Sequence, residues 1–144
     1  MIEDPPLPEL DADTAPFWEA SCRGELVIQG CSSCDRLRHP PRPMCPYCQS
    51  LDSTWRPMSG DATVWSYVVP HPPLLPAFMP YAPYNVCVVT LVEDPLIRLV
   101  GSVIESAGAA INSVDPATIE IGMPVRVVFE QVADDVALPR FVAR

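Results

Sequence analysis

Four of the six cysteines form two C-x2-C pairs separated by ten residues, and this spacing constrains the fold more than any other feature of the sequence. They are Cys31, Cys34, Cys45 and Cys48. Each pair can form a knuckle that directs both thiolates at one metal ion, and two knuckles complete the tetrahedral set typical of zinc. Cysteines so close in sequence form disulfides poorly. We therefore expect one zinc ion per chain, with iron in the same thiolate shell as the alternative.

The role expected for this metal is structural. Four thiolates leave no open coordination position for a water molecule, so the ion is not predicted to take part in catalysis. The surrounding segment has few apolar residues, and metal binding is therefore expected to supply much of its folding free energy.

The other titratable candidates do not form a catalytic set in the sequence. Cys87 lies in an apolar run, where a free cysteine usually behaves as a small buried side chain, and Cys22 lies outside the double knuckle. A nucleophilic thiol needs a nearby base, and the chain has only two histidines, His39 and His71. His39 is expected at the surface of the zinc loop. No catalytic residue is predicted.

Composition narrows the class of protein further. The chain has 144 residues and 49% hydrophobic residues, which suits a folded domain, and its 19 prolines favour short strands over long helices. All nine basic residues are arginines, and the net charge of −9 disfavours general nucleic-acid binding. An acidic, proline-rich start and the lack of a long apolar run predict neither a signal peptide nor a membrane span, so we expect a cytoplasmic protein.

Three regions are expected along the chain. Residues 1–13 hold five acids and three prolines without a base, which predicts a flexible acidic arm. A short helix should follow, with Thr14 as its cap, Pro16 in its first turn and Gly24 at its end. The helix and the zinc ribbon would occupy residues 14–58, and a barrel residues 59–144.

The rest of the chain has β periodicity, and the fold class expected is mainly β. Gly101 would allow a bulge that curls the sheet. A small, polar insert over 105–122 separates the third and fourth strands of the barrel. Five strands with such an insert suit a Greek-key barrel of the OB type. One strand is predicted in the ribbon, at residues 25–29. Five strands are predicted in the barrel, at residues 62–69, 86–92, 96–104, 125–130 and 138–142.

Two segments carry more large apolar side chains than their own structure needs. One is the short helix with Phe17 and Trp18, and the other is the proline-rich segment 70–84, which includes Leu75 and Phe78. If exposed, these side chains would form a hydrophobic patch, so they should either pack on their own domain or contact a partner chain.

Several short motifs follow one another in a fixed order along the chain. They are Pro16-Phe17-Trp18-Glu19, Gly24-Glu25-Leu26, the two cysteine pairs, Pro40-Pro41-Arg42, Trp55, Ser66-Tyr67, His71, Pro83-Tyr84, Gly122-Met123-Pro124-Val125 and Leu138-Pro139-Arg140-Phe141. Their order resembles the family called domain of unknown function 35, over about residues 14–142. The sequence departs from the family pattern at Asp61 and Asp94, both in turns.

The resemblance implies a rubredoxin-like zinc ribbon followed by an OB-fold barrel, and a partner subunit. Members of that family occur beside thiolase-fold enzymes that act on acyl-CoA, including thiolases and a lipid-transfer-protein-like aldolase of steroid side chains. We therefore expect a non-catalytic subunit or domain of a hetero-oligomer that assists acyl-CoA binding or transfer. The expected contacts with the partner or with acyl-CoA are Phe17, Trp18, Arg36, Arg38, Arg42, His71, Leu75 and Phe78, and the arginines suit phosphate groups.

Two other functions stay open at this stage. An OB barrel with exposed aromatic residues could bind single-stranded nucleic acid, for which Trp65, Tyr67 and Tyr84 would be the stacking candidates. The chain could also be an acyl-CoA enzyme that works without a partner.

Overall fold

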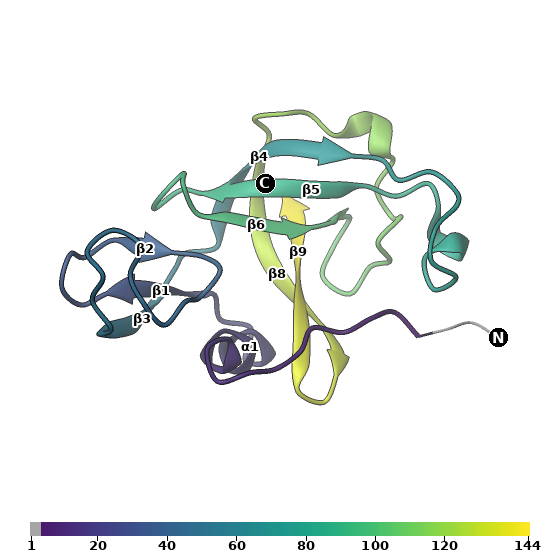
Figure 1. Ribbon diagram of the computed structural model, residues 1–144. Helices are drawn as coiled ribbons and strands as arrows, with labels where there is room; N and C mark the ends of the chain where they lie inside the picture. Colours follow the sequence, from purple (N-terminus) through teal and green to yellow (C-terminus); the bar gives the residue numbers. More distant parts are fainter. Residues whose placement is uncertain (1–3) are drawn as a thin grey trace.

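The computed structural model describes residues 4–144 and shows a small zinc ribbon beside a β-barrel (Figure 1). The mainly β fold class, with an N-terminal helix, a ribbon and an OB-type barrel, is confirmed. Residues 1–3 of the expected arm lie outside the described part, and residues 4–11 have no regular secondary structure. The elements are α1 (Ala15–Cys22), β1 (Val27–Cys31), β2 (Leu37–Arg38), β3 (Ser53–Pro57), β4 (Asp61–Val68), η1 (Met79–Tyr81), β5 (Val86–Leu91), β6 (Arg98–Gly101), β7 (Val103–Ile104), η2 (Pro116–Thr118), β8 (Pro124–Ala133) and β9 (Val136–Ala143).

Helix α1 begins after Thr14, as expected, but the cap works differently. The Thr14 side chain makes no bond to the helix, and its hydroxyl instead donates to Oδ1 of Asp11 at 3.0 Å. The same carboxylate accepts the backbone N–H groups of Asp13 and Thr14, so a short acidic turn leads into the helix. Gly24 ends the helix region with a φ of +76°, a conformation that favours glycine.

The barrel is one closed sheet with the strand order β6-β5-β4-β8-β9-β7. Closure depends on a break at Gly101, where the sequence predicted a bulge, and this break divides the strand expected over 96–104 into β6 and β7. Strand β6 pairs antiparallel with β5, whereas β7 pairs parallel with β9. One continuous segment therefore joins both ends of the sheet.

Gly101 lies at this break. A Cβ atom there would come within 2.6 Å of the carbonyl oxygen of Pro139, so only glycine allows β6 to approach β9. The side chain of Asn85, which is fully buried, completes the seam. Its Oδ1 accepts the Val103 N–H at 2.7 Å and its Nδ2 donates to the Val103 carbonyl at 2.9 Å, as a neighbouring strand would.

The ribbon is a three-stranded antiparallel sheet with the order β2-β1-β3. Its strands β2 and β3 were not predicted. Figure 1 shows α1 between the ribbon and the β8–β9 hairpin, and the helix packs on β9, β8 and β1. Phe17 and Ile28 join Val125 and Phe141 in a single hydrophobic cluster that runs from the helix and ribbon into the barrel.

Candidate functional site

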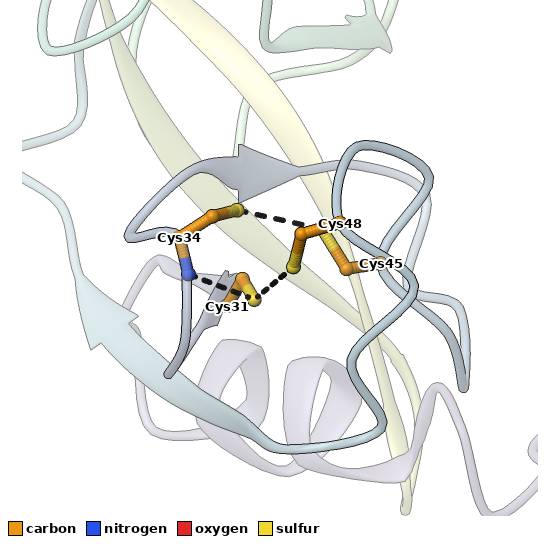
Figure 2. Close-up of side chains that lie close together, drawn as sticks. All are labelled: Cys31, Cys34, Cys45 and Cys48. Carbon is orange, nitrogen blue, oxygen red and sulfur yellow. Dashed lines mark hydrogen bonds between the residues drawn. The ribbon is translucent and has the colours of Figure 1, made fainter.

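The four knuckle cysteines converge in one place. Figure 2 shows their side chains pointing into the space between the two loops, and all four sulfur atoms lie within 4.8 Å of one another. The Sγ atoms of Cys31 and Cys48 are 3.5 Å apart, and those of Cys34 and Cys45 are 3.6 Å apart. A tetrahedron with Zn–S bonds of 2.3 Å has edges of about 3.8 Å, whereas a disulfide would need about 2.05 Å. The cluster therefore fits one zinc ion.

The local backbone also favours a thiolate in the first knuckle. The N–H groups of Cys34 and Ser33 each lie 3.4 Å from the sulfur of Cys31. These backbone hydrogen bonds, that from Cys34 foremost, lower the pKa of Cys31 to about 6. A site that stabilises the deprotonated sulfur is prepared for a cation.

Arg56 stabilises the loop of the first knuckle, a role that the sequence did not indicate. Its Nη2 lies 2.7 Å from a carboxylate oxygen of Asp35 and donates to the Cys31 carbonyl at 3.1 Å. A Cβ atom on Gly30 would overlap the guanidinium, so this glycine leaves the space that Arg56 needs. The ion pair of Arg56 and Asp35 links β3 to the loop of the first knuckle.

The three arginines expected to contact a partner or acyl-CoA have different environments. Arg38 is buried, and its Nε and Nη2 donate to the carbonyl of Arg42, so its guanidinium holds the ribbon together from inside. Arg36 is exposed and lies over the ring of Tyr47, with 4.4 Å between its Cζ and the ring centroid. Arg36 and Arg42 are the members of this group that reach solvent.

The aromatic pair on α1 is similarly divided. Phe17 is 5% exposed and belongs to the protein's own core, while Trp18 is partly buried beside it with its ring at 88° to that of Phe17. His39 packs against Phe17 at 5.4 Å between ring centroids. His39 is half-buried rather than fully at the surface, and this burial lowers its pKa to about 4.

The proline-rich segment 70–84 lies at the end of the barrel opposite the ribbon (Figure 1). Leu75 is 56% exposed and Met79 46%, whereas Phe78 is partly buried and stacks near Tyr84 at 6.0 Å. His71 is exposed in the same segment. The segment therefore covers part of its own barrel and also presents aliphatic side chains to solvent.

Cys87 is sealed inside the barrel. Its thiol has no exposed surface and donates to Oδ1 of Asn85 at 3.4 Å. Burial raises its pKa to about 11, so the thiolate needed for nucleophilic attack is strongly disfavoured.

The stacking surface needed for nucleic-acid binding is reduced by the structure. Of the three aromatic candidates, Tyr84 is buried and Tyr67 packs against the core. Trp65 is 50% exposed, but the guanidinium of Arg98 covers its ring at 3.9 Å. Successive bases need several free aromatic faces, so this surface does not support that function. Within residues 4–144, no helix has the length and apolar character needed to cross a membrane.

Comparison with known proteins agrees with both parts of the fold. The family profile for the ChsH2 rubredoxin-like zinc ribbon domain matches residues 18–53, and that for the ChsH2 C-terminal OB-fold domain matches residues 55–130. A probable enoyl-CoA hydratase alpha subunit of Thermomonospora curvata is 40% identical over 136 residues. The 3-oxo-4,17-pregnadiene-20-carboxyl-CoA hydratase alpha subunit of Mycobacterium tuberculosis is 37% identical over 122 residues.

These matches cover 94% and 85% of this chain, but the chain spans only 39% and 35% of the length of the two relatives. A solved structure described as the Ltp2-ChsH2(DUF35) aldolase is similar over almost the whole of both chains. Its TM-score is 0.80 with 38% identity, covering 95% of this chain and 98% of that chain.

A DUF35 protein of unknown function from Sulfolobus solfataricus has the same fold, with a TM-score of 0.62 and 15% identity over 92% of this chain and 86% of that chain. The resemblance to domain of unknown function 35 is thus confirmed. The chain belongs to the ChsH2 family, in which a rubredoxin-like zinc ribbon is joined to an OB-fold domain.

Proposed function

We propose that this chain is a non-catalytic component of an acyl-CoA enzyme. It docks on a thiolase-fold subunit, either a thiolase or a lipid-transfer-protein-like steroid aldolase, and assists the binding or transfer of the acyl-CoA. The observation that carries the proposal is the similarity over 98% of a chain in the structure described as the Ltp2-ChsH2(DUF35) aldolase. The two curated relatives are also named as subunits that act in acyl-CoA chemistry.

In this proposal Cys31, Cys34, Cys45 and Cys48 bind a structural zinc ion. The zinc holds the two knuckle loops and supplies no step of the reaction, because four thiolates fill its coordination shell. Its contribution is to fix the shape of the ribbon, including the loop that presents Arg36 and Arg42 to solvent.

The docking surface proposed is the exposed part of the proline-rich segment, with Trp18 and His71 as further contacts. Leu75 and Met79 are large and aliphatic, and about half of each residue is exposed to solvent. A segment rich in proline loses little conformational entropy on binding, so these side chains can act as anchors. Arg36 and Arg42 are proposed to meet the phosphate groups of acyl-CoA, since arginine binds phosphate through two parallel hydrogen bonds.

Co-purification with the thiolase-fold enzyme tests the docking. The double variant Leu75→Asp/Met79→Asp should weaken assembly by at least about 3 kcal/mol, because two anchors become charged groups in a desolvated interface. Phe78 is left intact, since its partial burial beside Tyr84 would confuse a folding defect with a binding defect.

The matched control is Leu96→Asp/Ile121→Asp, which changes two aliphatic side chains of similar type that are 72% and 69% exposed at other places on the surface. The control should still assemble and support turnover. Co-elution of the Leu75/Met79 variant with the enzyme at wild-type affinity would contradict the proposed surface. Turnover of an acyl-CoA by the purified chain alone would contradict the non-catalytic role.

A further inference from the structure

A cavity of about 580 Å³ lies away from the zinc centre, at the end of the barrel that carries the proline-rich segment. This volume falls in the range of about 300–1,000 Å³ that is usual for small-molecule sites. Four segments far apart in the sequence form its walls. They are residues 4–7 of the N-terminal arm, residues 77–81 of the proline-rich segment, residues 108–111 of the insert, and the β8–β9 hairpin.

The lining is mainly apolar. Phe78, Ile111 and Leu138 each come from a different wall, and together with Arg140 they also line an adjoining cavity of about 260 Å³. The two cavities adjoin at these shared residues, and together they are called the groove below. A mainly apolar lining suits an acyl chain or a ring system better than a compact polar molecule.

The charged groups in the lining favour an uncharged occupant. Nε of Arg140 lies 2.8 Å from Oε2 of Glu130, and the Arg140 side chain is only 15% exposed, so its charge is already neutralised. Asp4 is the other charged residue among those that line the larger cavity. One positive and two negative charges leave the lining with a net −1, which opposes a free carboxylate.

We propose that this groove binds the uncharged apolar part of an acyl thioester, such as an acyl chain or the rings of a steroid acyl group. The assignment to thioesters rests on the proposed function, whereas the apolar, carboxylate-rejecting character comes from the cavity itself. The arm forms one wall with residues 4–7, and Leu7 there is 47% exposed.

The test uses the full chain without a partner and the neutral probe S-decanoyl-N-acetylcysteamine, followed by two-dimensional NMR of backbone amides. Saturable shifts are expected for residues 108–111 and 136–140. Decanoate, which has a chain of the same length and a carboxylate, should bind at least tenfold more weakly. Asp4→Asn should narrow that difference by strengthening decanoate binding while leaving the thioester unaffected.

A cavity-filling variant provides the critical comparison. Ala110 is exposed in the insert and lines the cavity, so Ala110→Trp should fill the groove without disturbing the core and weaken thioester binding at least tenfold. Ala117→Trp, at an exposed alanine of the same insert that does not line the cavity, is the matched control and should bind normally.

The proposal is overturned if the thioester does not bind, if the shifted amides lie elsewhere, or if the two tryptophan variants behave alike. The outcome that overturns this proposal differs from the one that overturns the proposed function, because the first concerns ligand binding and the second concerns assembly with the enzyme. A chain that assembles but does not bind the probe loses only this inference, whereas one that binds the probe but never assembles loses the docking proposal.

Discussion

The zinc ribbon and the barrel are built from short strands but are closed by different means. In the ribbon, β2 has two residues, and Met44, Tyr47 and Leu51 around the knuckles are exposed, so little apolar area is buried there. In the barrel, Val89, Val125 and Phe141 have no exposed surface and the sheet closes on itself. The comparison teaches that metal coordination replaces a core in the first region, whereas burial and a hydrogen-bonded seam suffice in the second.

The boundary between the two regions runs through a single strand. Ile28, near the start of β1, lies in the hydrophobic cluster of the barrel, while Cys31, at the end of β1, belongs to the metal site. Damage to the metal site should therefore remain in the loops, and damage to the barrel should spread to the ribbon. The three predictions below test this asymmetry.

The largest effect is expected for Cys34→Ser. Loss of one thiolate should reduce the zinc content from one per chain to nearly zero and unfold both knuckle loops, because zinc binding to such sites is worth about 10–16 kcal/mol in small peptides. Metal analysis and hydrogen exchange would measure it, with protection retained in β4, β5, β8 and β9. Cys22→Ser is the control, since Cys22 lies outside the cluster and should leave the zinc in place. Loss of protection throughout the barrel would show that the two regions cannot fold separately.

A smaller effect is expected for Asn85→Ala in the barrel. This change removes both hydrogen bonds to Val103 and leaves its buried N–H and C=O without partners, which should lower the free energy of unfolding by about 2–4 kcal/mol. Chemical denaturation would measure it. Asn112→Ala, at an exposed position, should cost less than about 0.5 kcal/mol. An equal loss in the two variants would mean that the Asn85 side chain does not hold the seam.

The smallest effect concerns His39, at the junction of the ribbon and α1. Burial lowers the pKa of His39 to about 4, so the folded protein keeps it neutral while the unfolded chain takes up a proton near pH 6.5. The unfolded state binds more protons between these values, and the free energy of unfolding must therefore fall as the pH decreases from 6.5 towards 4.

Replacing His39 with Gln should remove the contribution of this residue to the pH dependence of the free energy of unfolding. That contribution is on the order of 1 kcal/mol between pH 7 and pH 5. Denaturation at several pH values would measure the difference. His71→Gln provides the comparison, because His71 is exposed in the proline-rich segment. If both histidine variants keep the wild-type slope, burial of His39 does not contribute to acid sensitivity.

Features that depend on neighbouring residues were predictable from the sequence. The cysteine spacing led to the metal cluster, and the alternation of apolar residues led to the barrel strands. These signals are local, because a knuckle and a strand period each involve only a few consecutive residues. Even the separation of Cys34 and Cys45 closes a loop short enough for the pattern to be recognised.

Features that depend on distant contacts were not predictable. The strands β2 and β3 exist because they pair with β1, and nothing in their composition marks them. A bulge at Gly101 was predicted, but its close approach to Pro139, which is 38 residues later in the sequence, was not. Arg38 was expected to contact a partner or acyl-CoA, yet the fold buries it and its guanidinium donates to the Arg42 carbonyl.

The sequence by itself determined that this chain would carry a four-thiolate metal site beside a small β-barrel, since residue types and spacing are enough to specify coordination and strand period. Only the tertiary structure decided which groups face solvent and which meet inside. It brought residues 4–7, 77–81 and 108–111 to the β8–β9 hairpin around one cavity, and it placed Phe17 and His39 in contact. The physical reason is that burial and long-range pairing depend on the closure of the whole barrel, a property that no short stretch of the chain contains.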